Sequence, residues 1–76
     1  MTLKELSVGQ SAIVKKIGTK GALKQRFVDM GLTKGVEVKV IKIAPLGDPI
    51  ELEVRGYNLS IRKDDAQFIE VEEIDS

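Results

Sequence analysis

One stretch, residues 22–35 with the sequence ALKQRFVDMGLTKG, limits the possible folds of this chain more than any other. Its apolar residues Leu23, Phe27 and Met30 recur at i, i+4 and i+7, so they share one face of a helix. The polar residues between them mostly point away from that face. No other segment has a convincing helical period, so we expect one short helix packed against other elements.

The helix is predicted to end at a glycine. Gly31 can adopt the left-handed conformation that ends a helix without the steric penalty of a Cβ atom. Leu32 follows as the apolar residue that can fold back onto Phe27 and close the cap. A second glycine, Gly35, comes four residues later, and the apolar period then changes from helix to strand. The unit is therefore a helix, a glycine stop, a tight turn and a strand.

Most of the remaining chain has the alternation of β-strands. In the longest strand, the apolar parity changes after Val40, which predicts a bulge. Residues 56–58 are predicted to form a tight turn, and residues 64–66 a single helical turn capped by Asp64. The predicted strands cover residues 12–17, 36–44, 50–55, 59–62 and 68–71.

These elements predict a mainly β fold. Five short strands in 76 residues are too few for two packed sheets of ordinary size. Closing them into a small, mainly antiparallel and partly open barrel would remove exposed strand edges. We expect one domain over residues 1–76, with residues 72–76 as a frayed acidic tail. The chain has no Cys, so no disulfide can stabilise it.

The charge is neutral overall but uneven along the chain. Residues 1–42 carry nine Lys or Arg against three acids, and residues 43–76 carry three against nine. Opposite charges on neighbouring strands explain this split more simply than a basic face for nucleic acid, because nucleic-acid modules are usually basic overall. The sequence contains neither a targeting segment nor a membrane-spanning run, which predicts a cytoplasmic, soluble protein that does not span a membrane.

The composition argues against catalysis and tight metal binding. The chain has no His and no Cys, so the commonest general base, the best nucleophile and the usual zinc ligands are absent. Neither glycine-rich segment has the spacing of a phosphate-binding P-loop. Carboxylates on an exposed strand face are usually solvated by water rather than bound to a metal ion. We therefore predict no enzyme activity, no cofactor and no metal ligands.

One loop remains as a candidate contact with a partner protein. An apolar residue between two prolines has little chance of reaching the core from a surface loop, and prolines reduce the entropy lost when a partner holds the loop. A stiff connector with its leucine folded onto the barrel is the alternative. The candidate residues are Pro45, Leu46, Gly47, Asp48 and Pro49.

Several segments, this loop among them, resemble a known protein family. The segments LKELSVGQSAIVKKI, RFVDMGLTKGVEVKV, APLGDPIELEVRG and LSIRKDDAQFIEV resemble the FeoA family, small cytoplasmic proteins that accompany the ferrous-iron transporter FeoB. The resemblance spans nearly the whole chain; Lys34 departs from it, where the family often has proline. It implies an SH3-like barrel with an inserted helix. It also implies assistance to ferrous-iron uptake through contact with FeoB, without transport by this chain itself.

Three functions follow as hypotheses. The leading one is an interaction module for a FeoB-type transporter. The alternatives are an interaction domain of the kind that ends some iron-dependent repressors, and a small nucleic-acid-binding barrel, which would need exposed aromatic residues for stacking. For the first, we expect Leu46 to anchor the partner and the helix face around Arg26 and Met30 to lie at the other end of the barrel.

Overall fold

The computed structural model describes residues 1–74. Within them, the chain forms five strands, a nine-residue helix, a four-residue helix and one 3-10 turn. In chain order these are η1 (Leu3–Glu5), β1 (Ser11–Ile17), α1 (Gly21–Asp29), β2 (Glu37–Ile43), β3 (Ile50–Val54), β4 (Tyr57–Ile61), α2 (Lys63–Ala66) and β5 (Ile69–Ile74).

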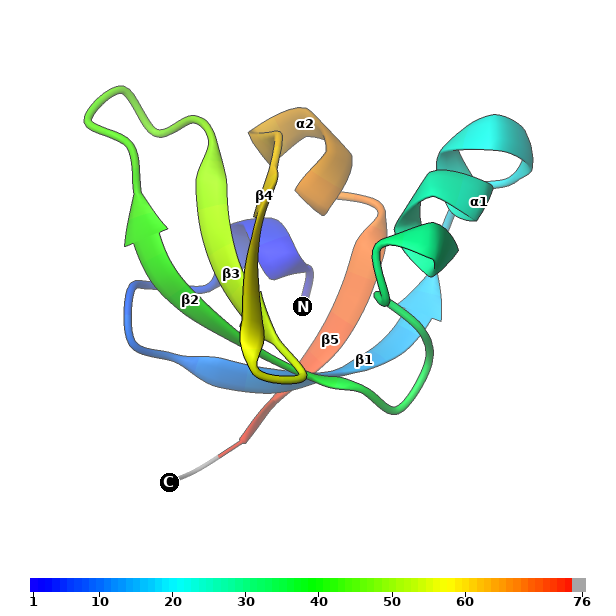
Figure 1. The fold of residues 1–76 in the computed structure, drawn as a ribbon, viewed down its shortest axis with the longest axis horizontal. Coiled ribbons are helices and arrows are strands. Elements are labelled where there is room, and N and C mark those ends of the chain that lie inside the picture. The colour runs from blue at the N-terminus through cyan, green and yellow to red at the C-terminus, as the bar shows by residue number, and fades with distance from the viewer. Residues whose placement is uncertain (75–76) are drawn as a thin grey trace.

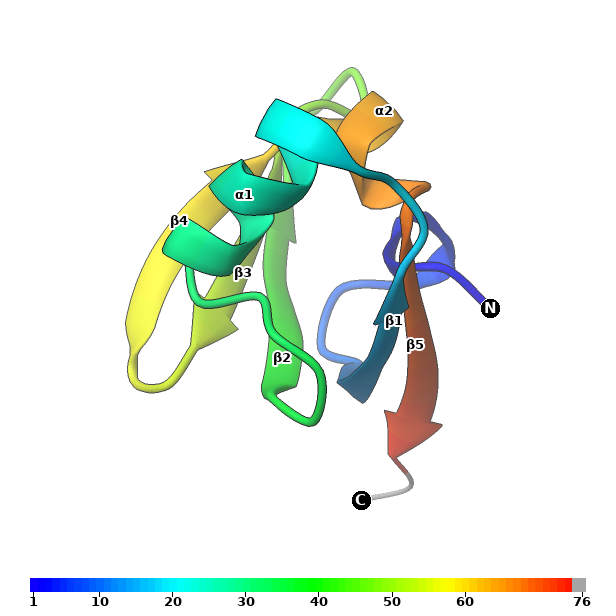
Figure 2. The ribbon, with the colours of Figure 1, turned by 90° about the vertical axis from the view of Figure 1, so that its right-hand side faces the viewer.

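The strands form one antiparallel sheet in the order β4-β3-β2-β1-β5. The sheet curls strongly, so β4 and β5 are edges of a partly open barrel rather than of a flat sheet (Figure 1). Viewed from the side, α1 and α2 lie at the same end of this barrel (Figure 2). The predicted mainly β fold, with five antiparallel strands and one longer helix, is confirmed.

The interior is filled mainly by aliphatic side chains. In β3, buried Ile50, Leu52 and Val54 alternate with more exposed glutamates, as the sequence pattern predicts for a strand with one wet face. Six half-buried residues pack around the buried core: Ile17, Leu23, Met30, Ile43, Leu59 and Phe68. The core itself consists of Leu3, Leu6, Ala12, Val14, Phe27, Leu32, Val36, Val38, Val40, Ile50, Leu52, Val54, Ile61, Ala66, Ile69 and Val71.

Two strands contain a register shift. The shift in β2 lies between Val40 and Lys42, where the sequence predicts a bulge. A second shift, in β1 between Val14 and Lys16, has no clear signal in the sequence. Because it interrupts the alternation of faces, the neighbouring side chains of Lys15 and Lys16 are both exposed.

The C-terminal end of α1 is closed by two backbone hydrogen bonds. The N–H of Leu32 donates to the carbonyl of Phe27 at 2.9 Å, and the N–H of Gly31 donates to the carbonyl of Val28 at 3.0 Å. This pair is the Schellman arrangement, which needs a left-handed residue, and Gly31 has φ +91°. Leu32 is thereby directed into the core, where it is fully buried beside Phe27.

The turn between β3 and β4 is shorter than the predicted turn over residues 56–58. Val54 still pairs with Tyr57, so only Arg55 and Gly56 connect the strands. Both have positive φ, 52° and 85°, as in the two-residue turns whose twist matches that of a hairpin. The predicted turn is wrong because Arg55, although it carries a Cβ atom, adopts a left-handed conformation, so the turn begins one residue before Gly56.

The frayed acidic tail predicted from residue 72 is also wrong within the described residues. Strand β5 continues to Ile74, which pairs with Ser11. The carboxylate of Glu72 lies 3.0 Å from Lys15 Nζ, and Glu73 accepts a hydrogen bond from the Gln10 side-chain amide. These cross-strand contacts offset the repulsion among the acids. Residues 75 and 76 lie outside the described part of the chain.

Candidate functional site

The loop between β2 and β3 is tightly closed at its base. The N–H of Ala44 donates to the carbonyl of Pro49 at 3.1 Å, and the N–H of Gly47 donates to the carbonyl of Ala44 at 2.7 Å. These bonds leave the intervening side chains outside the barrel. Leu46 is 96% exposed, the highest exposure of any large hydrophobic residue in the described chain. Its side chain therefore contributes almost nothing to the core.

Asp48 ties the loop to the short helix α2. One of its carboxylate oxygens accepts a hydrogen bond from the backbone N–H of Lys63, the first residue of that helix, at 3.0 Å. First-turn N–H groups have no partner within their own helix, and a carboxylate also complements the positive end of the helix. The prediction that Asp64 caps this turn is wrong, because the helix begins one residue before Asp64.

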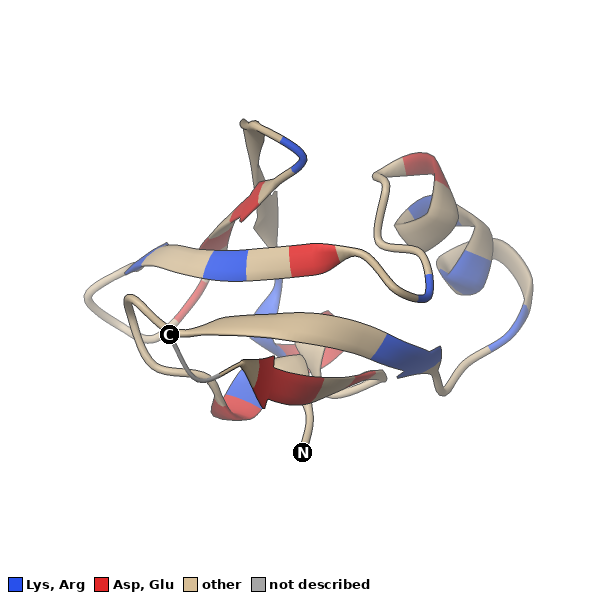
Figure 3. Ribbon diagram, turned by 90° about the horizontal axis from the view of Figure 1, so that it is seen from below, with Lys and Arg blue, Asp and Glu red and all other residues tan. Residues whose placement is uncertain are grey.

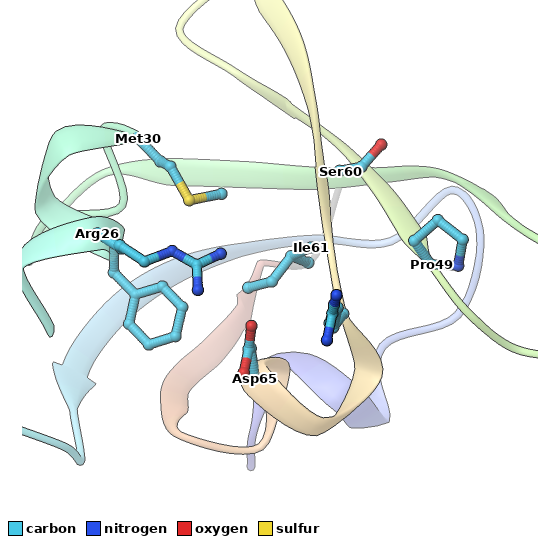
Figure 4. A pocket seen from close by; sticks show the side chains of 8 residues that line it. Arg26, Met30, Pro49, Ser60, Ile61 and Asp65 are labelled. Carbon is cyan, nitrogen blue, oxygen red and sulfur yellow. The ribbon is translucent and has the colours of Figure 1, made fainter. Parts of the chain in front are cut away.

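A cavity of about 250 Å³ opens between α1, β4, α2 and the end of this loop. Figure 4 shows Arg26 of α1, Met30 directly after α1 and Asp65 of α2 reaching into it, with Pro49 on the far side. The expectation that the helix face and the loop occupy separate ends of the barrel is therefore wrong for Pro49. The curl of the sheet brings the two segments together, whereas a straight β2 would separate them. Leu46 does not line the cavity.

The cavity combines charged and apolar walls. The guanidinium-bearing Arg26 and Arg62 and the carboxylate of Asp65 contribute charge, while Met30, Phe27, Ile61 and Pro49 contribute apolar surface. In residues 1–74, the only salt bridge within 4.0 Å is Lys15–Glu72, so the two arginines form none with Asp65. Such a mixed wall can accept a side chain of a partner but provides no nucleophile and base in contact with each other.

Tyr57 has a structural role that its predicted place in a turn did not indicate. It begins β4, and its hydroxyl donates to the carbonyl of Met30 at the end of α1 at 2.8 Å. This bond ties the helix to the edge strand of the barrel. The signal that could have found it is the Arg55–Gly56 pair, since a two-residue turn directs the next residue back along the sheet.

Comparison with known proteins identifies the domain. The model of the FeoA domain family matches residues 1–73. The chain belongs to the FeoA domain family. It is 34% identical over 71 residues to a putative Fe(2+) transport protein A of Campylobacter jejuni, covering 93% of this chain and 96% of that protein. None of the relatives described in this section is named for a catalytic activity.

A second relative is much longer than this FeoA domain. The chain is 38% identical over 76 residues to a fusion of Fe(2+) transport protein A with the Fe(2+) transporter FeoB from Porphyromonas gingivalis. All of this chain is covered, but only 9% of the fusion protein. The chain therefore matches the FeoA part of a protein whose remaining length is not represented here.

Solved structures agree with the fold of this FeoA domain. The FeoA protein of Chlorobium tepidum superposes with a TM-score of 0.91 at 39% identity, covering 99% of this chain and 71% of that one. FeoA of Stenotrophomonas maltophilia, described as a procaryotic SH3 domain protein and complexed with zinc, has a TM-score of 0.77 at 29% identity, covering 95% of this chain and 89% of that one. The SH3-like barrel implied by the resemblance is thus confirmed. A manganese-dependent transcriptional repressor, 17% identical with a TM-score of 0.89, covers 97% of this chain and 36% of that one and shares the fold alone.

The described part of this FeoA domain shows no protein-built metal centre. Within residues 1–74, no group of three or more His, Cys, Asp or Glu side chains is placed to hold a metal ion. The same residues contain no helix that is long and apolar enough to cross a membrane. The candidate site is thus the exposed loop over residues 45–49 and the neighbouring cavity.

Proposed function

We propose that this FeoA domain assists ferrous-iron uptake by docking on the cytoplasmic part of a FeoB-type transporter. The relative in which a FeoA part is fused to a FeoB transporter supports this proposal, because fusion keeps two interacting partners at high effective concentration. The domain itself carries neither His nor Cys for catalysis or soft metal coordination. Its contribution is therefore contact with the transporter rather than transport.

The observation that carries the proposal is the exposure of Leu46. Because the Leu46 side chain is 96% exposed, nearly all of its apolar surface remains available for burial against a partner. The loop around it is held in one shape by its base hydrogen bonds and by the bond from Lys63 N–H to Asp48. A loop that is already ordered loses less entropy on binding than a flexible one, so Leu46 is suited to be an anchor side chain.

The expected size of the effect follows from the buried area. Fully burying a leucine side chain contributes about 1.5–3 kcal/mol, which corresponds to roughly a 10- to 150-fold change in affinity. Replacing Leu46 by Ser should therefore weaken association with the transporter by about one to two orders of magnitude. The same change should shift the free energy of unfolding by less than about 0.5 kcal/mol, because the side chain lies outside the core.

The experiment compares Leu46→Ser with Val8→Ser. Val8 is 58% exposed in the turn before β1, so its replacement removes a similar exposed apolar side chain elsewhere on the barrel. Each variant is tested by pull-down from membranes that contain the transporter and by thermal unfolding. We expect only Leu46→Ser to lose association, with both melting temperatures near the wild-type value. A large fall in melting temperature with normal association of the folded fraction would reject the loop as the contact.

The nucleic-acid alternative has little support in the side chains. A single-stranded binder needs exposed aromatic faces on its strands. Phe27 is buried and Phe68 is half-buried against the core. Tyr57 is 47% exposed, but its hydroxyl is bonded to the carbonyl of Met30. The three aromatic residues are thus committed to the fold rather than arranged as a stacking platform.

A further inference from the structure

A second concave surface shares no lining residue with the cavity beside the loop. It is formed by the end of β1, the outer face of α1 and the loop that connects α1 to β2. Its volume is about 420 Å³, larger than the 250 Å³ of the cavity near Pro49. We name it the lysine groove; its main lining residues are Lys15, Lys16, Ile17, Lys24, Val28 and Lys34.

The lysine groove gathers four positive charges from three different segments. The register shift in β1 leaves Lys15 and Lys16 both exposed, α1 contributes Lys24, and the loop after α1 contributes Lys34. In Figure 3, basic segments of β1, α1 and the adjoining loops lie on the same side of the molecule. Like charges brought together in this way repel each other, and they attract anions from solution.

Charges on the sheet alternate in sign across neighbouring strands, whereas the charged residues in the described lining of the groove are all lysines. On the sheet, Lys39 stands opposite Glu53 and Lys42 opposite Glu51 in the strand register, although neither pair forms a salt bridge within 4.0 Å. Within residues 1–74, no carboxylate lines the lysine groove. Among residues 1–74, only Lys15 of the four lysines has an ion-pair partner within 4.0 Å, Glu72. The ammonium groups of Lys16, Lys24 and Lys34 therefore have no carboxylate within 4.0 Å in the described part of the chain.

The groove also has an apolar part. Val28 is 39% exposed on α1, although most large apolar side chains of the domain are buried. Ile17, at the end of β1, is half-buried and packs against the core. Both line the same concavity as the lysines, whose long methylene stems add further apolar surface. The groove can therefore hold an apolar side chain surrounded by ammonium groups.

We propose that the lysine groove binds an acidic segment of a partner protein, with one apolar side chain seated against Val28 and Ile17 and carboxylates paired with the lysines. A concave surface fits a protruding segment better than the flat surface of a bilayer. This contact is separate from the loop at residues 45–49, which contributes no residue to the lining of the groove. The inference does not depend on the role proposed for Leu46.

The test uses a synthetic peptide with one leucine flanked on each side by three glutamates, titrated into the isotopically labelled domain. We expect saturable chemical-shift changes at the amides of Lys16, Lys24, Val28 and Lys34. A peptide in which glutamines replace the glutamates should bind at least about tenfold more weakly, because the exposed ion pairs are lost. Raising the salt concentration should weaken binding of the acidic peptide in the same direction.

The key variant is Lys24→Glu combined with Lys34→Glu. Its matched control is Lys4→Glu with Lys63→Glu, which makes the same change in net charge at exposed positions away from the groove. We expect about a tenfold or larger loss of peptide affinity for the groove variant and less than a twofold change for the control. Val28→Ser tests the apolar part and should weaken binding by several-fold without altering the charge.

Several outcomes would overturn the proposal. These are equal losses in the groove variant and its control, shift changes that map elsewhere, or no saturable binding of the acidic peptide. Tighter binding of a single-stranded oligonucleotide or of phosphatidylglycerol vesicles than of the peptide would assign the groove to nucleic acid or to a membrane surface instead. Spectra of each variant that match the wild-type fold ensure that a loss of binding reports on the groove.

Discussion

Replacing Gly31 by alanine tests the packing of α1 against the sheet, because the substitution adds a single carbon atom. Its φ of +91° lies in the region that disfavours residues with a Cβ atom. A Cβ built there would lie 2.6 Å from the hydroxyl oxygen of Tyr57, far closer than carbon and oxygen can approach. That hydroxyl donates to the carbonyl of Met30 at 2.8 Å. Gly31→Ala would therefore strain the backbone and displace the tyrosine together.

The two effects can be estimated separately. Placing a residue with a Cβ in the left-handed region costs about 1–2 kcal/mol. Displacing the Tyr57 hydroxyl loses a hydrogen bond worth about 0.5–1.5 kcal/mol. Gly31→Ala should therefore lower the free energy of unfolding by about 1.5–3.5 kcal/mol, and each kcal/mol lowers the melting temperature of a domain this small by about 4–8 °C. Gly31→Val should cost at least as much because its side chain is branched and larger.

The control is Gly35→Ala, because Gly35 shares the positive φ of Gly31 but not its close neighbour. Gly35 has φ +90°, but a Cβ there would meet no atom within 4 Å outside its immediate neighbours. Its replacement should cost only the backbone strain, about 1–2 kcal/mol. Urea denaturation of both variants, alone and in a Tyr57→Phe background, separates the two terms. In that background, Gly31→Ala should become about as mild as Gly35→Ala.

Two results would refute this reasoning. If Gly31→Ala and Gly35→Ala cost the same in the wild-type background, the close approach of Tyr57 has no energetic consequence. If the denaturation midpoint of Gly31→Val equals that of the wild type, the left-handed stop at the end of α1 is also unsupported. Equal slopes of unfolding against urea concentration in all variants ensure that the same transition is compared.

Three further predictions concern capping, metal binding and protonation. Asp48→Ala should lower the free energy of unfolding by about 0.5–2 kcal/mol in urea denaturation, because it removes the acceptor of the Lys63 N–H at the start of α2. Asp48→Asn should lower it by less, and equal effects of the two substitutions would contradict the capping role of Asp48. Calorimetry with ferrous iron should detect no tight stoichiometric site in the isolated domain, since exposed carboxylates alone hold a borderline metal weakly, and a stoichiometric site would contradict this. The backbone N–H of Thr2 lowers the pKa of the Glu5 carboxyl, so an NMR titration should find this group ionised to lower pH than an unperturbed glutamate. Because the pKa of Glu5 is depressed in the folded state, the stability that Glu5 contributes is present above its unfolded pKa and disappears as pH falls through its folded pKa. If the wild type remained more stable than Glu5→Gln below that pH, the hydrogen bond from the Thr2 N–H to Glu5 would be contradicted.

The local pattern of the sequence was sufficient for most elements of the fold. Helix α1 follows from the spacing of Leu23, Phe27 and Met30, and β3 follows from strict alternation, because both signals depend only on neighbours along the chain. The bulge in β2 was also readable, since a change of parity in a strand must be absorbed somewhere. The high exposure of Leu46 agrees with a residue that the strand pattern left without a core position.

Long-range contacts decided the features that the sequence could not show. The end of β5 depends on its pairing with β1, and the position of Tyr57 depends on a turn in which Arg55 adopts positive φ. Asp48 caps a helix fifteen residues away, which no local pattern can indicate.

The sequence by itself determined the class of fold, the ends of the main elements to within a few residues, and the absence of His and Cys. Only the tertiary structure decided which residues come together to form the cavity and the lysine groove. The curl of the sheet placed Arg26 of α1 and Pro49 of the loop around one cavity, and Lys16, Lys24 and Lys34 came to line one groove. The physical reason is that secondary structure depends mainly on near neighbours and their periodicity, whereas a surface is assembled by the closure of the barrel from residues far apart in the chain.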